Sequence, residues 1–335
     1  MKCNHHEPLI LELEPIRGFY IPECTLNELK SPKRSKYLFK LPNKGYKNLA
    51  YVVNSWITNS TQTVVDIGGS SKTWYPGDLQ FMRLNIGSSS NPHDVTRYEL
   101  YSRRFGTGPL GVFWPVEATD KTSFMSYVKY MFPPPDQAVG EIGLYFTGYN
   151  SNTWPLILVA RVIIDPAITK YANTLYEEGW QIDFPANYTR WFVNIPLNYV
   201  WLQSTEIGFL FKDVNGNQYL TRQGNVWAGS PDVMIGSDNT PPSPTDYNLK
   251  SPIASLGNQT HVVEIDTSLQ ECRIVRYGTY TPPTNVTLGE VALFINIYDI
   301  SGTARKIMVA RGVWETPVTL VAGTTYTIGI ALKMG

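Results

Sequence analysis

Gly140-Glu141-Ile142-Gly143-Leu144-Tyr145 occurs a second time in this chain, 149 residues later, as Gly289-Glu290-Val291-Ala292-Leu293-Phe294. Other segments recur at nearly the same offset: Ile86-Gly87-Ser88 as Ile235-Gly236-Ser237, and Val159-Ala160-Arg161 as Val309-Ala310-Arg311. Chance similarity does not keep such a register over so long a span. Two copies at a period this long indicate a tandem duplication of whole domains and not a solenoid.

The composition fits two domains that are rich in β-structure. The 335 residues include 26 Gly, 24 Pro and 21 Tyr, and only 17% are charged, against about 25% in an average protein. Lys plus Arg and Asp plus Glu balance at 28 each, so no net charge attracts nucleic acid or an anionic membrane. No apolar run reaches the ~18 residues of a membrane helix, and the N-terminus lacks the apolar core of a signal peptide. We therefore expect no nucleic-acid partner and no membrane insertion.

Short alternating strands separated by turns are predicted from about residue 49 onward. Leu79–Ile86 alternates with period two, whereas the Pro-rich segment 132–136 must be a loop because proline has no N–H for a strand ladder. The best helix candidate, 168–178, is rejected because the second copy has a strand–turn pattern there. The sequence predicts an all-β fold with two tandem β-sandwiches, jelly-roll or immunoglobulin-like, over residues 49–188 and 189–335.

Residues 1–48 differ from the rest of the chain. They hold several prolines, short apolar runs and a basic series, Lys30, Lys33, Arg34, Lys36, Lys40 and Lys44. This composition predicts an extended N-terminal arm that orders itself on another surface. The alternative is a short edge strand and a long loop of the first domain.

Two charged pairs recur in both copies. Arg161 and Arg311 follow Val-Ala in otherwise apolar strands, and each is predicted to pair with the glutamate of its own copy, Glu141 or Glu290. We interpret them as structural staples between strands, because no nucleophile accompanies them.

No catalytic constellation, metal site or cofactor site is predicted. The spacing of His5 and His6 with Cys3 and Cys24 matches no common zinc site. With Cys272 the chain has three cysteines, which are too few for a disulfide framework. Segment 68–73 lacks the spacing of a phosphate loop and is predicted to be a hairpin or inter-strand loop, and Asn215-Gly216 is typical of a hairpin turn. His93 lies in a surface loop. Glu177 and Glu178 are adjacent, so in a strand they point to opposite faces, unlike the facing carboxylates of a glycoside hydrolase. The chain is predicted not to be an enzyme.

Sequons and aromatic residues offer surface roles. Asn-x-Ser/Thr sequons occur at Asn59, Asn187, Asn258 and Asn285 and matter only in a glycosylating compartment. A sugar-stacking platform is one interpretation of the aromatic set Trp191, Trp201, Trp227 and Tyr247, with Trp74 as a further candidate; packing in a core or subunit interface is the other.

The repeated motifs resemble those of structural proteins from bacteriophages and archaeal viruses, especially tail, fibre and other appendage components. The resemblance is carried by Gly140–Tyr145, Leu158–Arg161, Pro166–Lys170 and Trp180–Phe184 in the first copy. In the second copy it is carried by Met234–Pro242, Asp246–Leu249, Gly289–Phe294 and Val309–Arg311. It covers about residues 50–335, and its motifs have no catalytic content.

This resemblance implies a virion structural protein, a homo-oligomeric part of a tail, neck, turret or fibre that acts by assembly. Expected partners are copies of itself and other virion or capsid-associated proteins, the latter reached by the N-terminal arm. The alternative is an appendage that binds a host receptor or surface glycan. The copies differ in the 104–124 insertion of the first and in Lys170, which the second lacks. We therefore expect one copy to face a partner that the other does not.

Overall fold

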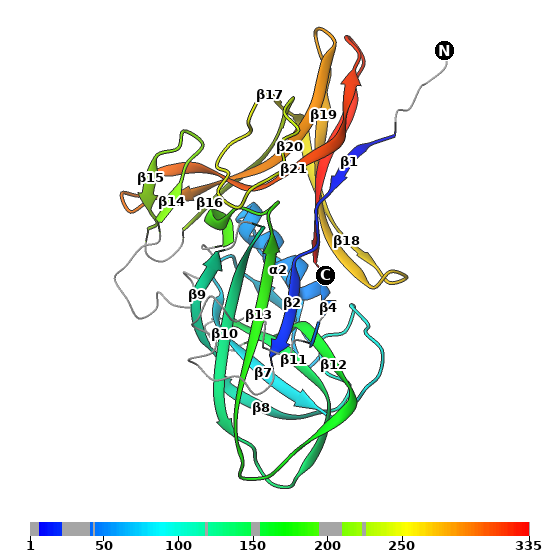
Figure 1. Ribbon diagram of the computed structural model, residues 1–335, viewed down its shortest axis with the longest axis vertical. Helices are drawn as coiled ribbons and strands as arrows, with labels where there is room; N and C mark the ends of the chain where they lie inside the picture. The colour runs from blue at the N-terminus through cyan, green and yellow to red at the C-terminus, as the bar shows by residue number, and fades with distance from the viewer. Residues whose placement is uncertain are drawn as a thin grey trace.

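The computed structural model describes residues 7–21, 41–42, 44–117, 120–148, 155–193, 210–222 and 226–334. β-Strands dominate these residues, which confirms the predicted all-β class (Figure 1). Within this part of the chain, no helix is long and apolar enough to cross a membrane.

Two five-stranded sheets are built mainly from residues 79–185. The first has the order β4 (Lys44–Gly45), β12 (Leu156–Lys170), β11 (Gln137–Gly148), β7 (Leu79–Gly87) and β8 (Arg103–Pro109). The second has the order β3 (Leu41–Pro42), β2 (Arg17–Ile21), β13 (Leu175–Pro185), β10 (Lys121–Met131) and β9 (Gly111–Glu117).

Two four-stranded sheets follow, built mainly from residues 227–334. One has the order β17 (Pro252–Ser255), β16 (Trp227–Gly236), β20 (Val286–Tyr298) and β21 (Ala304–Leu320). The other has the order β1 (Leu9–Glu12), β22 (Tyr326–Met334), β19 (Glu271–Tyr280) and β18 (Gly257–Asp266). The order β8-β7-β11-β12 thus recurs as β17-β16-β20-β21, and β13-β10-β9 recurs as β22-β19-β18.

Two hairpins complete the strands: β5 (Gln62–Val65) with β6 (Ser71–Trp74), and β14 (Leu210–Lys212) with β15 (Gln218–Leu220). The hairpin turn predicted at Asn215-Gly216 is confirmed, and so is the hairpin predicted at 68–73, where the turn ends before Ser71 and residues 71–73 belong to β6. The strand at Leu79–Ile86 and the loop at 132–136 are confirmed as well, and 168–178 is not helical.

The N-terminal segment lies on both groups of sheets. β1 pairs in parallel with β22, and β2 pairs antiparallel with β13. Between them, the Leu13 N–H donates to the Ala331 carbonyl and the Ile16 N–H donates to the Lys333 carbonyl, each at 2.9 Å. Residues 9–21 therefore tie one group of sheets to the other. The basic residues Lys30 to Lys40 lie outside the described residues.

The sequence analysis was wrong about residues 49–58, for which it expected strands. They belong to the helix α2 (Lys47–Thr58). β-Branched residues such as Val52 and Val53 favour strands locally, but α2 is buried on nearly all sides, with every residue from 52 to 57 buried, so tertiary packing overrides that preference. The helix ends at Asn59, which has a left-handed backbone (φ 50°).

α2 lies at the junction of the two groups of sheets (Figure 1) and contacts β5 and β12 on one side and β16, β18 and β19 on the other. The Trp56 ring stacks on Trp227 with centroids 6.2 Å apart. The Asn48 amide donates to the carbonyls of Val65 and Leu158, at 3.0 and 3.2 Å. One continuous buried cluster therefore runs through both halves of the molecule.

Candidate functional site

Glu141 and Arg161 form a fully buried ion pair between β11 and β12. Arg161 Nε donates to Glu141 Oε2 at 2.7 Å, and the backbone N–H groups of Tyr101 and Ser102 donate to the same carboxylate at 3.2 and 2.7 Å. Arg161 Nη1 donates to the Asn91 carbonyl at 2.8 Å. The pair thus anchors the two loop segments that lie beside the strands.

Glu290 and Arg311 repeat this arrangement in the second half. Arg311 Nε donates to Glu290 Oε2 at 2.6 Å, and the N–H groups of Lys250 and Ser251 donate to the carboxylate at 3.2 and 2.8 Å. Arg311 Nη1 donates to the Thr240 carbonyl at 3.1 Å. Each predicted glutamate therefore meets the arginine of its own copy, in a setting that serves to hold loops.

The two arginines differ in the further carboxylates around them. Arg311 also meets Asp238 Oδ1 at 3.2 Å and Asp246 Oδ2 at 3.3 Å. Arg161 lies against the Tyr101 ring, 5.0 Å from its centroid, and makes its other hydrogen bonds to backbone carbonyls. The second arginine is therefore surrounded by more negative charge than the first.

A second repeated feature was missed by the sequence analysis. In each β-hairpin an aspartate accepts two backbone N–H groups of its own turn: Asp66 from Gly68 and Ser70, Asp213 from Asn215 and Asn217, all at 2.9 Å. The turn glycines Gly69 and Gly216 have φ values of 75° and 82° and lie against Tyr98 and Tyr247. The signal in the sequence was an Asp three residues before each of these glycines.

The two copies also differ around Lys170, the last residue of β12. Lys170 and Glu178 are both buried there and contact each other through Nζ and Oε1. The register of β12 with β11 and of β21 with β20 places Leu320 at the position of Lys170, and the register of β13 with β10 and of β22 with β19 places Ile328 at the position of Glu178. Glu177 faces the other way and pairs with Lys129 at 2.6 Å, which confirms that the adjacent glutamates point to opposite faces.

The surface near Lys170 is apolar in the first copy. Met131, Tyr171 and Leu175 are 61, 58 and 52% exposed, and Ile168 is exposed beside them. Met131 and Leu175 are directly opposite each other in the β10–β13 ladder. The corresponding positions of the second copy hold Thr281, Val318, Val321 and Thr325. We call Met131, Ile168, Tyr171 and Leu175 the apolar tip.

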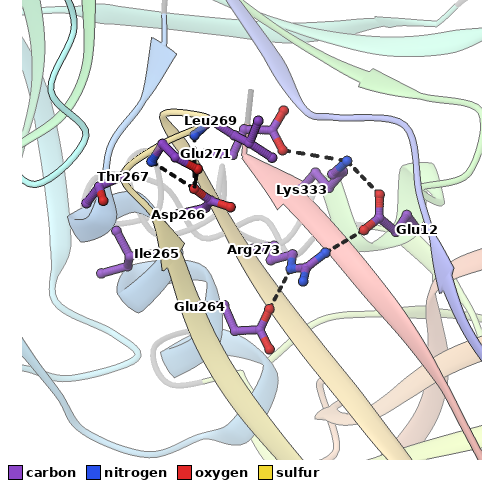
Figure 2. Close-up of a pocket in the computed structure, with 10 residues that line it drawn as sticks. Glu12, Glu264, Ile265, Asp266, Thr267, Leu269, Glu271, Arg273 and Lys333 are labelled. Atoms are coloured by element: carbon purple, nitrogen blue, oxygen red, sulfur yellow. Dashed lines mark hydrogen bonds and ion pairs between the residues drawn. The ribbon is translucent and has the colours of Figure 1, made fainter. Parts of the chain in front are cut away.

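A hollow of about 440 Å³ lies where β1 meets β19 and β22 (Figure 2). Arg273 pairs with Glu264 at 2.6 Å and with Glu12, while Lys333 pairs with Glu12 at 2.7 Å. The hydrogen bond from Lys333 lowers the pKa of Glu12. The ion pairs of Glu12 with Arg273 and Lys333 therefore hold β1 on its sheet.

The predicted sequons have different environments. Asn187 Nδ2 donates to the Arg311 carbonyl at 3.3 Å, and Asn59 ends α2 beside Gly229. Asn258 and Asn285 are exposed, and Asn285 accepts the Ala322 N–H at 2.8 Å.

The interpretation of the tryptophans as a sugar-stacking platform is wrong for three of them, because their side chains are buried. Trp74, Trp191 and Trp227 are buried in the core, so they cannot stack on a sugar at the surface. Tyr247 is exposed, and Trp201 lies outside the described residues.

His93, predicted in a surface loop, lies beside a buried tyrosine. The Tyr46 hydroxyl is 3.4 Å from His93 Nδ1, and burial raises the pKa of Tyr46 to about 12 despite the nearby Arg161.

No metal site emerges in the part of the chain that the structure describes. There, no group of three or more His, Cys, Asp or Glu side chains is arranged to hold a metal ion. Cys272 is fully buried on β19. Cys3, Cys24, His5 and His6 lie outside the described residues.

Comparison with known proteins adds little. No protein-family model matches the chain, and no curated protein matches it. A search of solved structures gives 2'-deoxycytidine 5'-triphosphate deaminase from Agrobacterium tumefaciens, 9% identical over 77% of this chain and 87% of that chain. Its TM-score of 0.12 is too low to support an argument about fold or function.

Proposed function

We propose that this chain consists of two copies of one β-sandwich unit, joined through α2 and the N-terminal strands, and that it is a structural protein of a virus particle. In this proposal it is a homo-oligomeric component of an appendage such as a tail, neck, turret or fibre. It acts by assembly and not by catalysis.

The observation that carries the proposal is a duplicated scaffold whose first unit exposes Met131, Tyr171 and Leu175 where the second unit has only threonine and valine. The strand orders and the buried Glu–Arg contacts recur, so corresponding residues form the internal contacts of both units. The apolar tip is present in the first unit alone. Exposed apolar clusters of this kind mark protein contacts. The first unit would therefore dock on a neighbouring subunit through the apolar tip.

Contact with other virion proteins is proposed for the N-terminal segment on the basis of its basic residues. The described strands β1 and β2 lie on the chain's own sheets, and most of the basic residues lie outside the described residues. In the receptor- or glycan-binding alternative, Trp74, Trp191 and Trp227 cannot be contact residues because they are buried. No observation favours this alternative over assembly.

Sedimentation velocity tests the assembly proposal. The wild-type chain is expected to associate in a concentration-dependent way. The variant Met131→Thr/Tyr171→Val/Leu175→Thr, which copies the second unit, should shift the equilibrium to monomer. The control is Leu269→Thr, an equally exposed leucine in the β18–β19 turn, which should not change association. A wild-type chain that stays monomeric, together with its absence from virus particles by mass spectrometry, would refute the proposal.

A further inference from the structure

The buried contact between Lys170 and Glu178 has a third member. Lys170 Nζ contacts Glu178 Oε1, and the Tyr130 hydroxyl donates to Glu178 Oε2 at 2.9 Å. Lys170 and Glu178 are 2% and 1% exposed. Lys170 comes from β12 in one five-stranded sheet, and Glu178 and Tyr130 come from the neighbouring strands β13 and β10 of the other, so the two sheets hold the amine, the carboxyl group and a hydroxyl donor together.

Aromatic rings enclose this contact. Lys170 Nζ lies 4.0 Å from the centroid of the Tyr176 ring and 5.6 Å from that of Tyr130. Phe132 packs against Tyr176, and Phe105 packs against both Tyr130 and Phe132. In such surroundings a separated ammonium and carboxylate cost free energy, which favours any route to a neutral product.

The second copy shows that the fold does not need these charges. Leu320 and Ile328 replace the lysine and the glutamate, while Tyr280 and Tyr326 keep the two tyrosines. Replacing a buried ion pair by apolar residues is often neutral or stabilising. Structural stability alone therefore does not explain why the first copy keeps a lysine and a glutamate in contact.

We propose that Lys170 and Glu178 condense into an intramolecular amide bond once the first unit has folded. A proton passes from the ammonium to the carboxylate, which leaves a neutral amine and a carboxylic acid. The Nζ lone pair attacks Cδ of Glu178 and forms the C–N bond. The Cδ–Oε1 bond then breaks, and Oε1 leaves as water with a second proton from Nζ. One amide and one water replace the ammonium and the carboxylate, and no oxidant is consumed.

Tyr130 supplies the hydrogen bond that this step requires. Burial and the neighbouring Glu178 raise the pKa of Tyr130, so its hydroxyl stays protonated and donates to Oε2. Charge develops on Oε2 as Nζ adds to Cδ, and a positioned donor stabilises it there. Oε2 then remains as the amide carbonyl oxygen, still hydrogen-bonded to Tyr130.

Mass spectrometry of the full-length protein tests the proposal. The intact mass should be lower than the sequence mass by one water. Trypsin should fail to cleave after Lys170, so that residues 162–190 appear as one peptide that also lacks one water. Full sequence mass and normal cleavage after Lys170 would overturn the proposal.

Matched variants assign the bond to these residues. Lys170→Leu/Glu178→Ile, which reproduces the second copy, should fold and show its full sequence mass. Tyr130→Phe should slow formation of the amide by about 100-fold, as loss of one oxyanion donor does. The control Lys129→Met removes the exposed ion pair on the same two strands and should keep the water loss. Water loss that persists in Lys170→Leu/Glu178→Ile would place the modification elsewhere and refute this assignment.

Discussion

Replacing Glu141 with glutamine should destabilise the protein more than the same change at Glu290. Each substitution keeps the side-chain shape and removes one buried negative charge. Because an amide has one oxygen, it cannot accept both from the arginine and from the backbone N–H on the other side. The two changes are therefore matched in everything except what else surrounds the arginine.

The magnitude follows from the charges that remain. In Glu141→Gln, Arg161 keeps two backbone carbonyls and the Tyr101 ring but no carboxylate, and removing one partner of a buried ion pair costs about 3–5 kcal/mol. In Glu290→Gln, Arg311 keeps Asp238 at 3.2 Å and Asp246 at 3.3 Å. The cost there should fall to about 1–3 kcal/mol, the range for a lost hydrogen bond to a charged group.

Urea unfolding followed by tryptophan fluorescence measures this difference. The free energy of unfolding from the midpoint and slope should be about 2 kcal/mol lower for Glu141→Gln than for Glu290→Gln. Adding Asp246→Asn to Glu290→Gln should bring the second site close to the first. Equal losses in the two single variants, or a larger loss for Glu290→Gln, would refute the role assigned to the extra carboxylates.

Three further changes test the packing and the buried charge. Gly236→Ala should cost about 2 kcal/mol in the same unfolding assay, because its Cβ would lie 2.6 Å from the Ser251 carbonyl oxygen; Gly108→Ala, which meets open space, should change stability by less than about 0.5 kcal/mol. Trp227→Ala removes the stack on Trp56 and should lower the free energy of unfolding by about 3–5 kcal/mol. The two halves should then unfold in separate transitions, and a single unchanged transition would contradict the idea that this stack couples them. Burial raises the pKa of Asp78 to about 6, above its unfolded value, so wild-type stability should fall as pH rises from about 4 to 6, and Asp78→Asn should remove that fall.

Local patterns gave the strands, the hairpins and the loops of this chain. Period-two alternation located Leu79–Ile86, and the Asn-Gly and Gly-Gly turns located both hairpins. The same patterns failed at α2, where Val52 and Val53 favour a strand and no side chain caps the first turn. Spacing in the repeat also predicted that each glutamate has an arginine in its own copy, but not the surrounding carboxylates, because Asp238 and Asp246 come from loops.

The sequence by itself determined the all-β class, the repeat and the partners Glu141–Arg161 and Glu290–Arg311, because these depend on periodicity and on one conserved offset. Only the tertiary structure decided where the N-terminal strands lie, how α2 joins the halves and which tryptophans are buried. It also decided that Tyr130, Lys170 and Glu178 meet, since contacts between side chains of different strands depend on register and burial that no local pattern records.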